Sequence, residues 1–312
     1  MRLCRYEQNG SVQIGFYHDD AITPLSSAAE ASGIEIPASD CLLTYLTHGS
    51  AREQVLALAK QLNSLLDEER GGLTIDVDDV KLLTPISNPS KLMLLAGNYS
   101  AHIEEGGGKS EERAKTFPYV FMKPPLTTLT HPGDPVRIPA VSPDHVDWEL
   151  ELGIVIGKQC KDVSEADALN YVAGYTVVND ISDRKFKPNP ERAQREKDGF
   201  FDWLHGKWHD TFCPVGPCVL AADNQPDPQT LKMTLKVNGE TEQDASTADM
   251  VFPVSAVVEF VSSFVTLEPG DIISTGTPSG VGAAKGKFLK NGDTLEACIE
   301  NIGVLTNPVT GP

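Results

Sequence analysis

The stretch HVDWELELGIVIGK, residues 145–158, constrains the fold of this chain more than any other. Apolar side chains occupy every second position over most of its length, which is typical of a strand with one face against a core. These apolar residues are Val146, Trp148, Leu150, Leu152, Ile154 and Ile156. The opposite face carries Asp147, Glu149 and Glu151, with no basic residue between them. Like charges on one face of a strand repel one another, so this face needs a partner that offsets them.

A divalent cation is one partner that would offset these charges. Residues two apart on a strand lie roughly 6.5–7 Å apart and point the same way, so two glutamates can converge on one point above the sheet. All-oxygen ligands favour Mg²⁺, Mn²⁺ or Ca²⁺ over zinc. Asp180 ends the apolar run YVAGYTVVND and is a third candidate ligand. The alternatives are a solvated polar face for the glutamates and a turn or helix cap for Asp180, and the pattern alone does not decide.

Composition excludes several other classes of protein. The formal net charge is −18 over 312 residues, the wrong sign for a protein that binds nucleic acid. The six cysteines are scattered and favour free thiols rather than a zinc site or a disulfide framework. Neither a signal peptide nor an apolar run of membrane-spanning length is evident. These observations predict a cytoplasmic protein with no membrane partner.

The order of predicted elements indicates an α+β, β-rich fold. Up to about residue 85 we expect a small α+β unit whose helix lies within residues 51–72, followed by a linker at 82–91. Beyond residue 118 most segments have the pattern of strands, and Asn238-Gly239 predicts a hairpin turn. Two further helices are expected, over 164–172 with a capping box and over 254–265.

Residues 98–117, NYSAHIEEGGGKSEERAKTF, are too polar and glycine-rich to be core. We expect a short helix that carries His102 and Glu105, then a mobile loop. The pair is spaced i, i+3, so the glutamate can orient the imidazole and raise its basicity. Without further information, an exposed histidine in a flexible loop is the simpler interpretation. GGGKS does not complete a phosphate-binding loop, because position 103 is isoleucine where that motif needs glycine.

Five blocks, taken in order, resemble the fumarylacetoacetate hydrolase family. They are AGNYSAHIEE, DWELELGIVIGK, GYTVVNDISDR, HGKWHDTFCPVGP and LEPGDIISTGTPSGVG. The resemblance covers nearly the whole chain. It implies a catalytic domain over residues 89–312 built as a mixed β-sheet or β-roll, preceded by a small N-terminal α+β domain over residues 1–88. It also implies a homodimer.

The resemblance also implies roles for individual residues. Glu149, Glu151 and Asp180 would be ligands of Mg²⁺ or Mn²⁺, with Ca²⁺ a further candidate. His102 and Glu105 would form a catalytic dyad on a lid, over about residues 103–116, that orders over substrate. Lys207 matches the catalytic lysine. The expected substrate-binding residues are Tyr99, Arg184, Lys187 and Thr277.

The segment from Arg184 to Lys207 departs from the family pattern. It begins RKFK where the family commonly has aspartate and glutamine at the second and fourth positions, so lysines stand at 185 and 187. It holds seven basic residues against four acids. We expect it to supply local positive charge for a substrate more anionic or more oxygenated than a simple acylpyruvate. The alternative is a solvated charged loop.

The resulting hypothesis is a metal-dependent hydrolase that cleaves a carbon–carbon bond in a 2,4-diketo acid of the acylpyruvate type. His102 would take a proton from the attacking water, a bound cation would stabilise the enolate, and Lys207 would face the developing oxyanion. The same ligands could serve an oxaloacetate-type decarboxylase, or an isomerase or hydratase of unsaturated 2-oxo acids. In each case the partner is a small anionic 2-oxo or diketo acid.

Overall fold

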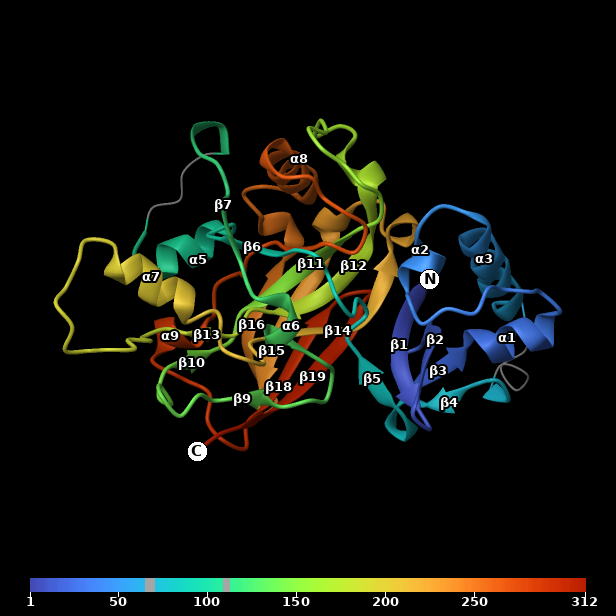
Figure 1. The fold of residues 1–312 in the computed structure, drawn as a ribbon, viewed down its shortest axis with the longest axis horizontal. Helices are drawn as coiled ribbons and strands as arrows, with labels where there is room; N and C mark the ends of the chain where they lie inside the picture. Colours follow the sequence, from blue (N-terminus) through green and yellow to red (C-terminus); the bar gives the residue numbers. More distant parts are fainter. Residues whose placement is uncertain (65–70, 109–112) are drawn as a thin grey trace.

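The computed structural model describes residues 1–64, 71–108 and 113–312, and its fold is α+β and rich in strands, as predicted (Figure 1). The largest sheet runs in the order β4-β3-β2-β1-β14-β12-β11-β17-β6-β7, with β5 paired to β1 and β8 paired to β14. Apart from the strands of the N-terminal segment, this sheet consists of β6 (Leu92–Ala96), β7 (Tyr119–Met122), β8 (Leu129–Thr130), β11 (Leu150–Ile156), β12 (Val172–Asn179), β14 (Cys213–Ala221) and β17 (Ile272–Ser274). Across the described residues, no helix has both the length and the apolar character needed to cross a bilayer.

A second sheet packs against the first and closes the main core. Its order is β16-β15-β18-β19-β9, and buried side chains of both sheets belong to one hydrophobic cluster. The strands are β9 (Val136–Arg137), β15 (Lys232–Val237), β16 (Glu240–Ser246), β18 (Thr294–Ile299) and β19 (Gly303–Thr310). The turn between β15 and β16 has positive φ at both Asn238 (53°) and Gly239 (81°), so the predicted hairpin is confirmed.

The N-terminal segment is a small α+β unit, and its strands continue the large sheet. Its elements are β1 (Arg2–Gln8), β2 (Ser11–Tyr17), β3 (Ala21–Pro24), α1 (Leu25–Ser32), α2 (Leu43–Leu46), α3 (Ser50–Leu62), β4 (Ile75–Asp76) and β5 (Lys81–Leu83). The expected helix is present as α3, while residues 65–70 lie outside the described residues. Because β1 pairs with β14, the two parts share one sheet. The boundary between residues 88 and 89 stays a prediction.

The remaining helices lie around the two sheets. They are α5 (Ser100–Glu105), α6 (Pro125–Thr128), α7 (Asp198–His205), α8 (Val254–Phe264) and α9 (Gly282–Lys285). The helix expected over 254–265 is therefore confirmed as α8, whereas α7 was not anticipated. The helix expected over 164–172 is wrong, since only a 3₁₀ turn, Ala168–Tyr171, forms there. Ser164 and Asp167 do bond to each other, but the chain enters β12 at Val172 and leaves no room for an α-helix.

The strand expected over residues 145–158 is broken in two. β10 (Val146–Asp147) pairs with β13 (Ser182–Asp183), and β11 begins only at Leu150. Trp148 and Glu149 lie between the two strands. The break occurs because β10 and β11 belong to different sheets, so the chain must change direction between them. This change separates Asp147 from the two glutamates.

Candidate active site

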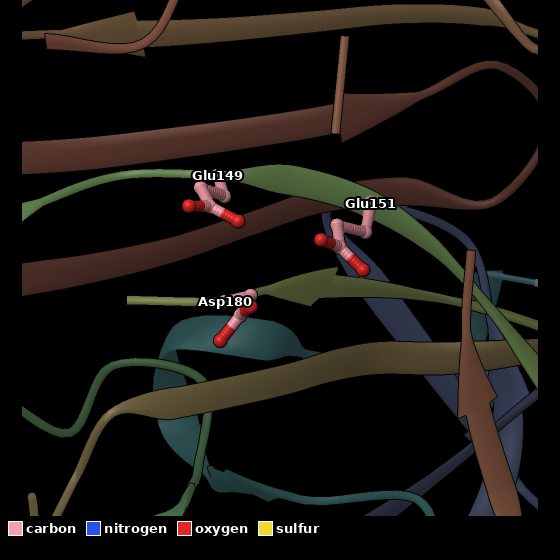
Figure 2. Close-up of side chains that lie close together, drawn as sticks. All are labelled: Glu149, Glu151 and Asp180. Carbon is pink, nitrogen blue, oxygen red and sulfur yellow. The ribbon is translucent and has the colours of Figure 1, made fainter. Parts of the chain in front are cut away.

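Three carboxylates meet where β11 begins and β12 ends (Figure 2). Glu149 precedes β11, Glu151 is its second residue, and Asp180 directly follows β12. The two strands are antiparallel with Leu150 opposite Asn179, so the start of one lies beside the end of the other. One oxygen of each carboxylate lies within 4.8 Å of the other two, and all three residues are buried. The structure thus brings together the three acids that the sequence predicts as ligands.

The surroundings of Glu151 fit a divalent cation. Its Oε2 accepts hydrogen bonds from the hydroxyl of Ser274 (2.5 Å) and the backbone N–H of Gly276 (2.9 Å). Its Oε1 is buried without a hydrogen-bond partner, which is unfavourable for a carboxylate oxygen. Burial, together with the neighbouring Asp180 and Glu149, raises the pKa of Glu151 well above its ordinary value. A cation coordinated by all-oxygen ligands would satisfy the free oxygen and relieve the repulsion, which suits Mg²⁺, Mn²⁺ or Ca²⁺.

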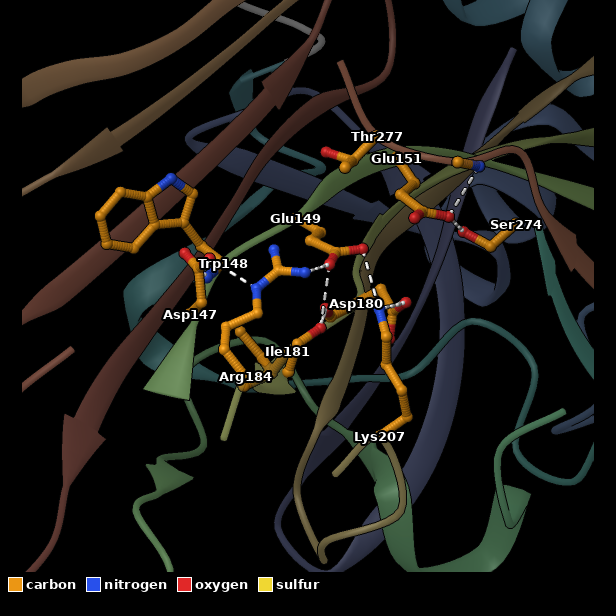
Figure 3. A network of polar contacts seen from close by, with 12 residues as sticks. Asp147, Trp148, Glu149, Glu151, Asp180, Ile181, Arg184, Lys207, Ser274 and Thr277 are labelled. Atoms are coloured by element: carbon orange, nitrogen blue, oxygen red, sulfur yellow. Dashed lines mark hydrogen bonds and ion pairs between the residues drawn. The ribbon is translucent and has the colours of Figure 1, made fainter. Parts of the chain in front are cut away.

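Buried cationic side chains flank the carboxylates (Figure 3). Lys207 Nζ donates to Glu149 Oε2 at 2.9 Å and to Asp180 Oδ2 at 2.6 Å. Burial alone would raise the pKa of Glu149, but Lys207 and Arg184 more than offset this effect and hold the pKa well below its ordinary value. Conversely, the two carboxylates outweigh desolvation and raise the pKa of Lys207, which therefore stays charged. The lysine predicted as catalytic lies inside the carboxylate cluster.

Asp147 does not join the three predicted ligands, although it belongs to the same acidic stripe. Its carboxylate accepts hydrogen bonds from the backbone N–H groups of Gly282 (2.7 Å) and Ala283 (2.9 Å) at the start of α9. Arg184 links it to the cluster, with Nε 2.7 Å from Asp147 Oδ2 and Nη1 2.7 Å from Glu149 Oε1. Arg184 Nη2 is buried without a hydrogen-bond partner. This nitrogen is therefore a free donor beside the carboxylates, as a substrate-binding arginine requires.

His102 and Glu105 lie side by side on α5, and His102 Nδ1 has no hydrogen-bond partner among the described residues, so the catalytic dyad stays a prediction. His102 Nδ1 lies 3.5 Å from Glu105 Oε2, and each side chain is about one-fifth exposed (21%). Glu105 also accepts the backbone N–H of Gly280 at 3.0 and 3.1 Å, which attaches α5 to the turn after β17. The imidazole is close enough to Glu149 to contribute to the lowering of its pKa. The predicted lid runs on over residues 103–116, of which 109–112 lie outside the described residues.

The other predicted substrate residues occupy different environments. Thr277 is buried, its hydroxyl donating to the carbonyl of Leu150 (2.9 Å) and accepting from Gln243 (2.8 Å). Tyr99 is almost fully buried, and its hydroxyl contacts the sulfur of Met233 at 3.3 Å. Lys187 is exposed on the loop before α7. The substrate contacts of all three stay predictions.

The charge of the segment from Arg184 to Lys207 is largely balanced within the protein. Arg192 forms ion pairs with Asp198 and Asp202, and Arg195 also pairs with Asp198. Arg184 and Lys207 face the carboxylate cluster. These pairs use four of the seven basic side chains that the sequence counts as local positive charge, so any excess rests on the remaining lysines.

Lys123, Ser274 and Gln243 contact this site but escaped the sequence analysis. Lys123 follows the short apolar strand β7 and forms an ion pair with Asp180. The sequence offered one indication of Lys123, a lysine that directly follows the apolar run YVFM. Ser274 belongs to the segment ISTGTPSG, from which only Thr277 was predicted to contact substrate. Gln243 gave no signal, because its partners lie on other elements.

Comparison with known proteins identifies the class. Residues 91–310 match the family described as fumarylacetoacetate (FAA) hydrolase C-terminal, so the chain belongs to the fumarylacetoacetate hydrolase family of enzymes. A 2,4-didehydro-3-deoxy-L-rhamnonate hydrolase from a Sphingomonas species is 42% identical over 99% of this chain and 96% of its own length. A mitochondrial oxaloacetate tautomerase of Xenopus laevis is 41% identical over 74% of this chain and 69% of its own. Among solved structures, maleylpyruvate hydrolase from Sphingobium sp. SYK-6, in complex with manganese(II) and pyruvate, has a TM-score of 0.73 at 30% identity, covering 100% of this chain and 99% of its own.

Proposed function

We propose that this protein is a metal-dependent hydrolase that cleaves the carbon–carbon bond of an acylpyruvate, a 2,4-diketo acid. The observation that carries the proposal is the His102–Glu105 pair, held on α5 against a buried cluster of three carboxylates. The relative from Sphingomonas supports it, since its substrate name describes oxo groups at carbons 2 and 4 of an acid. That acid also carries a hydroxyl on its acyl side, which makes it a more oxygenated acylpyruvate.

A divalent cation held by Glu149, Glu151 and Asp180 would supply positive charge that polarises the substrate carbonyls and lowers the energy of an enolate. His102 Nδ1 faces Glu105, so Nε2 is the atom that would take a proton from water. The hydroxide adds to carbon 4, the bond between carbons 3 and 4 breaks, and its electron pair leaves with the pyruvate half as an enolate. A proton returned to carbon 3 then gives pyruvate, and the acyl half leaves as a carboxylic acid.

Lys207 and Arg184 would bind the charged parts of the substrate. An ammonium has three N–H donors, and Lys207 directs two of them at Glu149 and Asp180. The third can stabilise the oxyanion that forms on carbon 4. Arg184 Nη2, buried and unpaired, is suited to the substrate carboxylate. Lys187 stays a predicted contact for the distal end of a more oxygenated substrate.

The second candidate function uses the same ligands without water. Tautomerisation or decarboxylation of oxaloacetate also passes through an enolate, and the oxaloacetate tautomerase among the relatives supports it. The dyad favours hydrolysis, which needs a base that activates water, and the products distinguish the two functions, because only hydrolysis consumes water.

A comparison of substrates with matched variants tests the proposal. The full chain is assayed for pyruvate release from acylpyruvates, and for conversion of oxaloacetate, with Mg²⁺ or Mn²⁺ and after chelation. We expect cation-dependent pyruvate release that His102→Asn lowers by roughly 10²–10⁴-fold. His48→Asn, at an exposed histidine of the N-terminal unit, is the control and should not alter it. Turnover of oxaloacetate without pyruvate release from any acylpyruvate would replace hydrolysis with the second candidate.

A further inference from the structure

We propose that Lys123 is a positioning residue that holds Asp180 in the orientation a bound divalent cation requires. The proposal rests on the proposed metal site. The side chain of Lys123 is fully buried, as is that of Asp180, and the two form an ion pair through Nζ and Oδ1. Asp180 Oδ2 is held from the other side by Lys207 (2.6 Å). One oxygen of this carboxylate therefore accepts a hydrogen bond from Lys207 and the other forms an ion pair with Lys123, and the two contacts restrict rotation of its plane.

Lys123 also ties together the segments that carry the site. Its Nζ donates to the carbonyl of Ile181 at 2.8 Å and to that of Phe212 at 2.5 Å. Ile181 directly follows Asp180, and Phe212 directly precedes β14. Lys123 itself lies just after β7, at the end of the large sheet. One ammonium thus joins three chain segments around the end of β12.

The partners of Lys123 separate its role from that of Lys207. Lys123 Nζ donates hydrogen bonds to two carbonyls and forms an ion pair with Asp180, so its ammonium is committed to protein groups. Lys207 contacts two carboxylates and retains one donor. Lys123 therefore acts through Asp180, whereas Lys207 can face a ligand directly.

Two physical effects of Lys123 on cation binding have opposite signs. A positive charge beside a ligand repels the incoming cation, so through electrostatics alone its removal would tighten cation binding. A side chain that orients a ligand raises affinity, and losing such partners typically costs about 10–100-fold. Weaker cation binding after removal of Lys123 would therefore indicate a positioning role, and tighter binding would indicate only a repulsive charge.

The experiment measures Mn²⁺ binding to the full chain without substrate, by the electron paramagnetic resonance signal of free Mn²⁺. We expect Lys123→Met to weaken binding by about tenfold or more and Lys123→Gln, which keeps two N–H donors, to weaken it less. Lys161→Met is the matched control, because Lys161 also contacts two carbonyls and a carboxylate but lies outside the site. It should bind Mn²⁺ like the wild type.

Unchanged or tighter Mn²⁺ binding by Lys123→Met would overturn the proposal. If the methionine variant does not fold, as judged by near-ultraviolet circular dichroism, Lys123→Gln decides by the same criterion. A wild-type chain that binds no Mn²⁺ would instead refute the proposed metal site itself. The failure of the positioning role and the failure of the metal site therefore give different results.

Discussion

At the scale of single residues, buried charge is the dominant feature of this protein. Four carboxylates and three cationic side chains share one water-poor region. They are Asp147, Glu149, Glu151, Asp180, Lys123, Arg184 and Lys207. The formal excess of one negative charge would become one positive charge with a divalent cation bound. A monoanionic acid would then neutralise the site, so cation and acid should bind cooperatively.

Burial also predicts which cysteines react with thiol reagents. All six are free, and only Cys41 is exposed. Burial raises the pKa of both Cys4 and Cys213 to about 12, so near pH 8 they remain protonated thiols, and the reactive thiolate forms only as the pH approaches that value. With Ellman's reagent at pH 8 we expect one fast equivalent, which Cys41→Ser removes. Several fast equivalents in the native protein would contradict the buried positions.

At the scale of elements, the turn between β17 and α9 joins three parts of the site. Gly276 donates to Glu151, Thr277 to the backbone beside Glu149, and Gly280 to Glu105 on α5. Gly280 has φ +101°, and an added Cβ would lie 2.2 Å from the carbonyl oxygen of Glu242. The turn can therefore hold α5 against the site only with glycine at this position.

Gly280→Ala should consequently impair both stability and turnover. Strained backbone costs about 1–3 kcal/mol, and the clash adds to it. Gly133→Ala is the matched control, since Gly133 also has positive φ (+79°) but nothing lies within 4 Å of an added Cβ. We expect a larger fall in melting temperature for Gly280→Ala than for the control, with a loss of turnover that the control lacks. Equal effects of the two substitutions would show that the contact with Glu242 is unimportant.

At the scale of the whole molecule, apolar surface collects at one end of the large sheet. β7 is the last strand of that sheet, and α7 lies near it (Figure 1). Exposed apolar side chains in this region are Tyr119, Met122, Phe200, Phe201 and Trp208. The indole N–H of Trp208, which follows α7, donates to the carbonyl of Met122 on β7 and so connects the two elements. A net charge of −18 opposes self-association, so a stable contact between two copies needs apolar surface of this kind.

The homodimer implied by the family is accordingly expected to use this end of the sheet. Sedimentation equilibrium should give about twice the 33.7 kDa mass of one chain. Phe200→Ser combined with Phe201→Ser should shift the protein toward monomer, because both rings are about half exposed (57% and 46%) on α7. Val141→Ser, at an exposed apolar residue elsewhere, is the control. A monomeric wild type would refute the dimer, and an unaffected double variant would move the contact to another surface.

The sequence alone determined the features that depend on neighbours close along the chain. Strand-typical apolar runs predicted the central strands, Asn238-Gly239 predicted its hairpin, and the apolar run at 254–265 predicted α8. Glu149 and Glu151 could be paired as candidate ligands because two-residue spacing places them on one side of the backbone. Asp180 was a candidate because it ends an apolar run, and only the resemblance implied that it shares one site with the two glutamates.

Only the tertiary structure decided the features that depend on distant partners. Asp147 carries the same charge as its two neighbours, yet the direction change at Trp148 turns it toward α9, 135 residues later. Lys123 resembles any lysine after a strand until Asp180 and two carbonyls surround its ammonium. Burial sets the role of such a charge, because in a water-poor interior an ionised group is stable only beside partners that other parts of the chain supply.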